Sequence, residues 1–219
     1  MSYRLFLFDL DGTLIDTSPG ILDALRRTEE VLGVSPLPME TLRKFIGPPL
    51  EWSFETYYQL SPEEARERSG VYREIYGTEG VRHSTVYPYI PETLAYIREH
   101  GGKSAVTSLK QDRMVDITLG NYRMQPMFDA IVGHSDAHPT KADTIRRAME
   151  LLHWEDCAST MLFGDSRYDG EGAMEVGIGF VPLTYGFGFS DPHSLEGIQQ
   201  ISIAHEPIDV LHFVQKQFE

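Results

Sequence analysis

The sequence predicts an α/β fold in which a parallel sheet carries helices on both faces. Two observations predict it. Short apolar, β-branched or aromatic runs alternate with segments of helical periodicity, and the first run, LFLF at 5–8, is apolar throughout, as expected of a strand buried on both faces. Strands that alternate with helices pair in parallel, because each helix returns the chain to the same end of the sheet. We therefore expect a Rossmann-like core.

The individual elements follow from these runs. The expected strands lie at 3–8, 103–107, 129–132, 160–163, 178–181 and 200–204. The expected helices lie at 91–100, 110–120, 140–152, 168–176 and 206–217. Ligands of such sheets bind at the carboxyl ends of the strands, so polar residues at those ends are the first candidates for a site.

One segment interrupts the alternation. Ser18-Pro19 is a helix start, and after it apolar residues recur at helical spacing. Ser61-Pro62-Glu63-Glu64 begins a second, charged helix. No strand pattern occurs between them. We expect a small all-helical insertion of residues 17–84, placed after the first strand of a Rossmann-like core domain that comprises residues 1–16 and 85–219.

Composition limits the possible partners and the location. The chain has 219 residues and a formal net charge of −14, which argues against nucleic acid or an anionic membrane as a standing partner. A single cysteine, Cys157, rules out a disulfide within the chain, and no apolar run is long enough for a membrane span or a secretory signal. We expect a cytoplasmic protein. The oligomeric state stays open, and a monomer is compatible with the sequence.

The end of the first strand carries two acids, in FDLDGT. Asp9 and Asp11 are two residues apart, so on an extended chain their side chains point to the same side, and Gly12 lets the backbone turn after them. Two close carboxylates repel each other and are costly to desolvate. Taken alone, the pattern fits a polar loop as well as a site.

Three further stretches place polar residues at the same predicted edge of the sheet, where a strand ends or a helix begins. SAVTSL ends in Thr107 and Ser108, whose hydroxyls suit phosphate oxygens, and PTKADTIRRAM places Lys141 in the first turn of a helix. MLFGDSRYDGEGA places Asp165 at a strand end and Asp169 four residues later. Several carboxylates near one lysine are typical of a site for a hard cation, and Mg²⁺ prefers oxygen ligands that it shares with phosphate.

The chain resembles a known family at these residues. FDLDGTLIDT, VTS, Lys141 and GDSRYDGEGA are similar, in order, to the four signature motifs of the haloacid dehalogenase-like superfamily. The helical insertion resembles the cap of its phosphoglycolate phosphatase-like and β-phosphoglucomutase-like branch. The resemblance implies a Mg²⁺-dependent phosphatase that acts on a small phosphorylated metabolite.

The resemblance also implies roles for the site residues. Asp9 matches the nucleophile that forms an aspartyl-phosphate, and Asp11 matches the general acid/base. The implied Mg²⁺ site comprises Asp9, Asp11 (through its backbone carbonyl), Asp165 and Asp169. The implied phosphate contacts are Thr107, Ser108 and Lys141, and Lys141 would also offset charge on Asp9.

Two stretches leave alternatives open. Related sequences usually carry a lysine directly after the Thr-Ser or Thr-Asn of the second motif. Here Leu109 stands at that position and Lys110 follows it, which puts a phosphate contact of this lysine in doubt. YGFGF at 185–189 suits either a binding loop or a loop packed beside the site.

In the cap, a rigid turn at Gly47 follows Arg43 and Lys44. These two cations either meet a substrate anion or are solvated helix charges.

Three other functions compete with the phosphatase. An inorganic pyrophosphatase remains possible, since pyrophosphatases of this branch carry a similar cap turn. A β-phosphoglucomutase-like mutase is disfavoured, because Pro48, Pro49, Leu50 and Glu51 stand where such mutases carry basic residues. A non-catalytic binder would be favoured by loss of the motif residues, and these are all present. The sequence does not identify the substrate.

Overall fold

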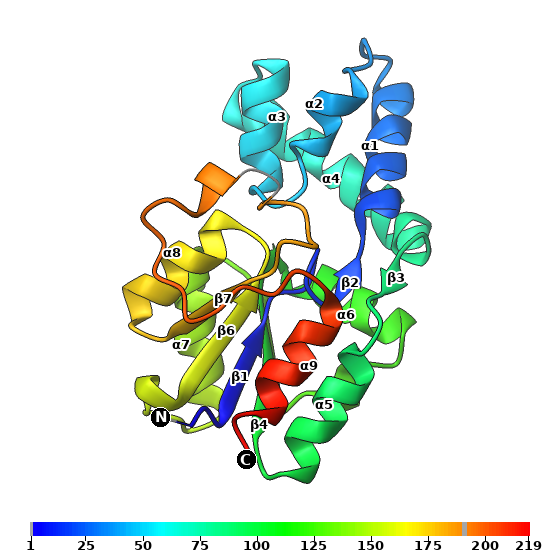
Figure 1. Ribbon diagram of the computed structural model, residues 1–219. Coiled ribbons are helices and arrows are strands. Elements are labelled where there is room, and N and C mark those ends of the chain that lie inside the picture. Colours follow the sequence, from blue (N-terminus) through cyan, green and yellow to red (C-terminus); the bar gives the residue numbers. More distant parts are fainter. Residues whose placement is uncertain (1, 190–191) are drawn as a thin grey trace. The chain divides into compact units, whose positions relative to one another are not determined.

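A five-stranded parallel sheet forms the centre of the larger part of the chain in this computed structural model, which describes residues 2–189 and 192–219 (Figure 1). Its strands are β1 (Leu5–Phe8), β4 (Lys103–Gln111), β5 (Ala130–His134), β6 (Thr160–Gly164) and β7 (Gly179–Pro182). Their order across the sheet is β5-β4-β1-β6-β7, and all neighbours run parallel. The α/β fold class is therefore confirmed.

Successive side chains of β1 pack on opposite faces of this sheet. Phe6 and Phe8 belong to one apolar cluster and Leu5 and Leu7 to the other, and all four are buried. The first face is covered by α5 (Ile90–Glu99), α6 (Asp112–Asn121) and α9 (Pro207–Gln215). The second face is covered by α7 (Lys141–Leu151) and α8 (Arg167–Val176). An apolar strand is stable here because helices exclude water from both of its faces.

The strand order creates a switch point beside β1. The chain first adds β4 and β5 on one side of β1 and then β6 and β7 on the other side. The connections after β1 and β6 therefore leave in opposite directions, which opens the carboxyl edge of the sheet for a ligand. Asp9 directly follows β1 and continues the alternation of Leu5 and Leu7, whose face is the one that α7 and α8 cover.

Contacts divide the chain into two compact units, residues 1–15 with 86–219, and residues 16–85. The second unit contains α1 (Ser18–Leu32), α2 (Met39–Arg43), α3 (Leu50–Tyr58), α4 (Pro62–Thr78) and a short 3-10 helix, η1 (Gly80–Arg82). All residues from 17 to 84 are described, and none of them is in a strand. The chain passes between the units at β2 (Ile15–Asp16) and β3 (Thr85–Val86), which pair as a two-stranded ribbon. That the helical unit acts as a cap stays a prediction.

The expected strand at 200–204 was wrong. Ile201 N and Ala204 N donate to the carbonyls of Phe180 and Pro182 beside β7. These donors are three residues apart, whereas a parallel ladder uses alternate residues, so this segment pairs with β7 only at isolated points. The β-branched composition of the segment indicated a strand, but its side chains do not alternate between a buried and an exposed face.

The boundary between β4 and α6 also differs from the prediction. The strand continues to Gln111 and the helix begins at Asp112, two residues later than expected. Thr107 pairs with Val132 and Gln111 with His134, so four steps along β4 match two steps along β5. Residues 108–110 therefore bulge out of the ladder.

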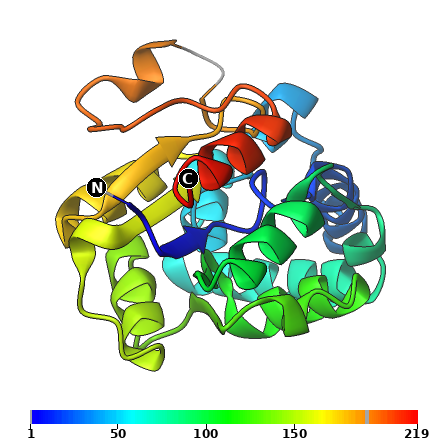
Figure 2. The ribbon, with the colours of Figure 1, turned by 60° about the horizontal axis from the view of Figure 1, so that its bottom comes forward.

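The segment before β1 and the segment after α9 lie near each other (Figure 2). Arg4 Nη1 donates to the carbonyl of Gln217 at 2.6 Å. Among the described residues, no helix is both long enough and apolar enough to cross a bilayer.

Candidate active site

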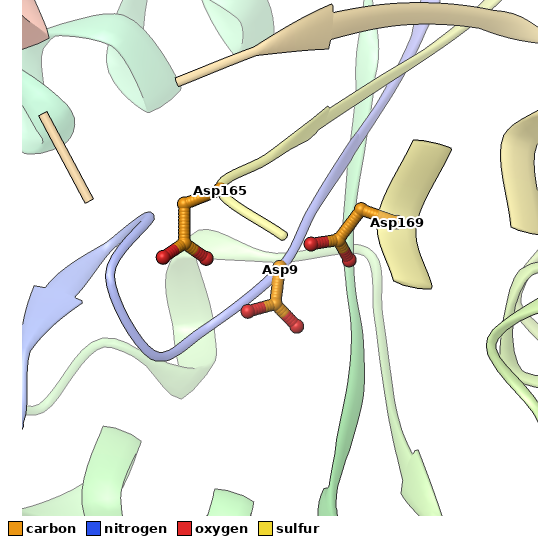
Figure 3. A group of neighbouring side chains, drawn as sticks. All are labelled: Asp9, Asp165 and Asp169. Atoms are coloured by element: carbon orange, nitrogen blue, oxygen red, sulfur yellow. The ribbon is translucent and has the colours of Figure 1, made fainter. Parts of the chain in front are cut away.

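Three buried carboxylates converge at the carboxyl edge of the sheet. Asp9 follows β1, Asp165 follows β6, and Asp169 lies in the first turn of α8. One oxygen of each lies within 4.8 Å of the others (Figure 3). Asp9 is 8% exposed, Asp165 3% and Asp169 1%. The structure therefore brings together three acids that the sequence analysis singled out.

Lys141 lies among these acids. It is the first residue of α7, whose start is stabilised by reciprocal hydrogen bonds between Thr140 and Asp143. Lys141 Nζ lies 2.7 Å from Asp9 Oδ1 and 2.5 Å from Asp169 Oδ1, and it also donates to the carbonyl of Thr107. Burial alone would lower the pKa of Lys141, but the charges of Asp169 and Asp9 outweigh it and raise that pKa. The lysine is therefore positively charged.

Asp9 and Asp165 are destabilised as anions. The pKa of Asp9 is raised to about 7, because burial and the charges of Asp169 and Asp11 raise it by more than Lys141 lowers it. Burial and the charge of Asp9 raise the pKa of Asp165 well above its usual range. A divalent cation among these oxygens would relieve this repulsion, and carboxylates are the hard ligands that Mg²⁺ prefers. The residues present therefore fit a Mg²⁺ ion.

Asp169 has protein partners on both oxygens. Oδ1 contacts Lys141, and Oδ2 accepts hydrogen bonds from Ser166 N at 2.9 Å and Ser166 Oγ at 2.6 Å. These contacts start α8 and hold the ammonium of Lys141 in place. Direct coordination by Asp169 would have to share an oxygen with them.

The backbone packs closely around Asp165. The amide of Phe187 donates to Asp165 Oδ2 at 2.6 Å. A Cβ on Gly12 would lie 2.2 Å from that same oxygen, and one on Gly186 would lie 2.3 Å from the Asp165 Cβ. Gly12 also has a φ of +76°, which favours glycine. Both positions therefore require a residue without a side chain.

The segment YGFGF packs beside the site. Besides the Phe187 amide on Asp165, the Tyr185 hydroxyl donates to the carbonyl of Thr13 at 3.0 Å. Sequence reasoning left this segment between two interpretations, and its contacts show that it packs beside the site, against Asp165. The close-spaced glycines at 186 and 188 are the signal in the sequence.

The side-chain hydroxyls of Thr107 and Ser108 in β4 differ in their hydrogen bonding. Thr107 Oγ1 is buried and has no hydrogen-bond partner among the described residues, and Thr13 Oγ1 is in the same condition. Buried polar atoms are normally paired, so an unpaired one at a strand end points to a ligand. Ser108 Oγ accepts a hydrogen bond from the backbone amide of Lys110 at 3.2 Å, so its own hydroxyl hydrogen can still be donated to a ligand.

Asp11 lies beside Lys110, a residue whose role the sequence analysis left open. Lys110 Nζ lies 2.8 Å from Asp11 Oδ1 and 3.1 Å from Oδ2. Sequence reasoning missed this pair, because the bulge in β4 that carries Lys110 has no periodic signal.

The predicted specificity residues lie in the helical unit. Arg43 ends α2, Lys44 follows it, and both are exposed. Gly47 has a φ of +107° and forms the turn before α3. Their role toward a substrate stays a prediction.

The chain matches the model of a family described as haloacid dehalogenase-like hydrolase over residues 6–182, and it belongs to this family. Similar proteins include a 5′-nucleotidase from Pseudomonas aeruginosa, 30% identical over 193 residues, with 87% of each chain covered. A phosphoglycolate phosphatase from Pseudomonas putida is 27% identical over 202 residues, which cover 88% of this chain and 74% of the relative.

Solved structures of the same family are also similar to this chain. A haloacid dehalogenase-like family hydrolase from Streptococcus pneumoniae is 34% identical with a TM-score of 0.87, and 96% of this chain and 98% of the other are covered. A predicted phosphatase from Clostridium acetobutylicum is 30% identical with a TM-score of 0.89, and 99% and 100% are covered. The protein is an enzyme, a haloacid dehalogenase-like phosphatase of the phosphoglycolate phosphatase-like branch.

Proposed function

We propose that the protein is a Mg²⁺-dependent phosphatase that hydrolyses a small phosphorylated metabolite through an aspartyl-phosphate at Asp9. One observation carries the proposal: the Asp9 carboxylate lies at the switch point of the sheet, held 2.7 Å from a buried lysine, with Asp11 two residues further on. Nucleophilic carboxylates need such a held geometry and a nearby acid for the leaving group.

The proposed reaction has two displacements at phosphorus. In the first, an Asp9 oxygen attacks, the bond from phosphorus to the leaving oxygen breaks, and Asp11 donates its proton to that oxygen. In the second, Asp11 takes a proton from water while the water oxygen attacks phosphorus and the bond to Asp9 breaks. Phosphate leaves, and both acids return to their starting state.

Lys141 and Thr107 would bind the transferring group. Lys141 places a positive charge beside Asp9, and the unpaired hydroxyl of Thr107 lies at the end of the neighbouring strand. Fixed donors that face the developing charge on phosphorus oxygens supply most of the catalysis in phosphoryl transfer. Asp9, Asp165 and the Asp11 carbonyl would hold Mg²⁺, which when bound supplies further positive charge beside the phosphoryl oxygens.

The relatives and the net charge support the proposed substrate class. Two relatives are named 5′-nucleotidase and phosphoglycolate phosphatase, so nucleoside monophosphates and phosphoglycolate are the first substrates to test. A net charge of −14 supports a small molecule rather than nucleic acid. We propose that the helical unit is a cap that excludes water, and that Arg43, Lys44 and the Gly47 turn set substrate preference.

The test is a panel of phosphate compounds assayed with Mg²⁺ for released phosphate. It includes nucleoside monophosphates, phosphoglycolate, sugar phosphates and pyrophosphate, and Asp9→Asn is the control for contaminating activity. Selective release from one monoester class supports the proposal. Release from pyrophosphate alone would favour the pyrophosphatase, and isomerisation of a sugar phosphate without release would favour the mutase. Repeating the panel with Arg43→Ala and Lys44→Ala tests the cap residues.

A further inference from the structure

The site contains a second lysine, and its ammonium contacts Asp11. Lys110 Nζ lies within hydrogen-bond distance of both Asp11 oxygens, at 2.8 and 3.1 Å. The two side chains are only 11% and 17% exposed. Lys141 contacts Asp9 and Asp169 instead. Each proposed chemical acid, the nucleophile and the proton donor, therefore has a lysine of its own.

The backbone that carries Lys110 is held by several contacts. Its amide donates to Ser108 Oγ at 3.2 Å inside the bulge of β4. On the neighbouring strand, Gly133 N donates to Asp112 Oδ1 at 2.6 Å. A Cβ on Gly133 would lie 2.7 Å from the carbonyl oxygen of Lys110, so the bulge packs directly on this glycine. The lysine is thus placed by a built feature of the sheet and not by a flexible surface loop.

We propose that Lys110 is a positioning residue for Asp11: it orients the carboxyl group that donates a proton to the leaving oxygen and later takes one from water. This inference rests on the proposed function. A free aspartate rotates about two side-chain bonds, and a contact with both oxygens removes that freedom. Proton transfer needs the donor oxygen aligned with the leaving oxygen, so a fixed orientation accelerates it. Lys110 itself makes and breaks no covalent bond.

The effect of replacing Lys110 should depend on the basicity of the leaving group. An alkoxide is a strong base and needs a proton as it departs, whereas p-nitrophenolate is a weak base and departs without one. The ratio kcat/KM covers the steps up to the first irreversible one, which is the transfer of phosphorus to Asp9. It therefore reports on protonation of the leaving group and not on the later attack by water.

The experiment compares Lys110→Met with the unaltered enzyme on an alkyl phosphate and on p-nitrophenyl phosphate. We expect kcat/KM to fall by about tenfold to a hundredfold on the alkyl phosphate, and by less than about threefold on p-nitrophenyl phosphate. Lys110→Arg keeps the charge and the donors and restores most of the loss. Asp11→Asn should show the same difference between the two substrates (the split), with a larger loss on the alkyl phosphate than Lys110→Met.

Lys103→Met is the matched control. Lys103 begins the same strand and pairs with Asp129 at 2.8 Å on the surface, with half of its side chain exposed. Lys103→Met should leave kcat/KM unchanged on both substrates. Thermal unfolding of each variant with Mg²⁺ shows whether it is folded, and Lys110→Gln replaces the Met variant if that one unfolds.

Two outcomes overturn the proposal. An equal loss on both substrates means that Lys110 binds the phosphate or supports the fold, and no loss on either means that Asp11 is oriented without it. Asp9→Asn reports separately on the proposed function. If it abolishes turnover of both substrates while Lys110→Met shows no split, only the role of Lys110 fails.

Discussion

Lys141 and Asp9 are 132 positions apart in the sequence, yet Lys141 Nζ lies 2.7 Å from Asp9 Oδ1. The side chain of Lys141 is 3% exposed and that of Asp9 12%. The parallel sheet explains the contact, because the carboxyl end of β1 and the start of α7 lie on the same edge and the same face. A buried ion pair of this kind stabilises each charge only while both partners are present.

Replacing Lys141 should therefore damage both chemistry and stability. We expect Lys141→Met to lower kcat by about a hundredfold to a thousandfold, because it removes the fixed positive charge beside the nucleophile. It should also lower the melting temperature, because Asp9 and Asp169 lose a partner. Arg146→Ala is the control, since Arg146 lies on the same helix and pairs with exposed Glu175. A kcat within about threefold of the unaltered enzyme would contradict the role of Lys141.

The raised pKa of Asp9 predicts how stability depends on pH in the absence of metal. Folding raises this pKa from 3.8 to about 7, so between these values the folded protein binds more protons than the unfolded one. The free energy of unfolding of the metal-free protein therefore falls as the pH rises from about 4 to about 7. The raised pKa of Asp165 acts in the same direction.

Mg²⁺ should oppose this loss, because it binds the ionised acids and competes with protons. We expect the rise in melting temperature on adding Mg²⁺ to be larger at about pH 8 than at about pH 5, measured by calorimetry against a matched series with chelator. The variant Asp165→Asn should lose most of the rise at the higher pH. A rise of equal size at both pH values would contradict a site made of these carboxylates.

The unpaired hydroxyl of Thr107 predicts an effect on binding without an effect on stability. Thr107→Val keeps the shape and loses no hydrogen bond of the free protein, so its melting temperature should be unchanged or slightly higher. Its kcat/KM should fall by about tenfold, which corresponds to one lost hydrogen bond to a charged group. Thr118→Val should behave in the opposite way, since Thr118 Oγ1 donates to the carbonyl of Met114 at 2.7 Å on α6, away from the site. Unchanged kinetics of Thr107→Val would remove Thr107 from the phosphate contacts.

Gly12 should tolerate no side chain. Its φ is +76°, and a Cβ would lie 2.2 Å from Asp165 Oδ2, so Gly12→Ala should lower the free energy of unfolding by about 2 kcal/mol or more and abolish the effect of Mg²⁺ on melting. Gly33→Ala isolates the contribution of the backbone. Gly33 has a φ of +62°, and a Cβ there would meet no atom within 4 Å, so only the backbone strain of about 1 kcal/mol applies. Equal losses in urea unfolding of the two variants would show that the contact with Asp165 is unimportant.

The sequence predicted those parts of the structure that depend on repeated patterns. Alternating strands and helices indicated the parallel sheet, and the spacing of Asp9 and Asp11 indicated two carboxylates at one edge. The contact of Lys110 with Asp11 was missed because a bulge adds residues without any periodic signal. The amide of Phe187 on Asp165 joins segments 22 residues apart, and no local pattern reports such a contact. The wrong strand at 200–204 came from composition, which cannot show whether a partner strand is in register.

The most direct test of the account is to trap the intermediate at Asp9. Enzyme with Mg²⁺ and its best substrate is quenched in acid during turnover and reduced with borohydride, which converts an aspartyl-phosphate into homoserine, and the peptides are then mapped by mass spectrometry. The account predicts homoserine at position 9 alone, and none without substrate or in Asp9→Asn. Homoserine at position 11 or 165 during turnover, or sustained turnover by Asp9→Asn with reversion to aspartate excluded, would contradict it.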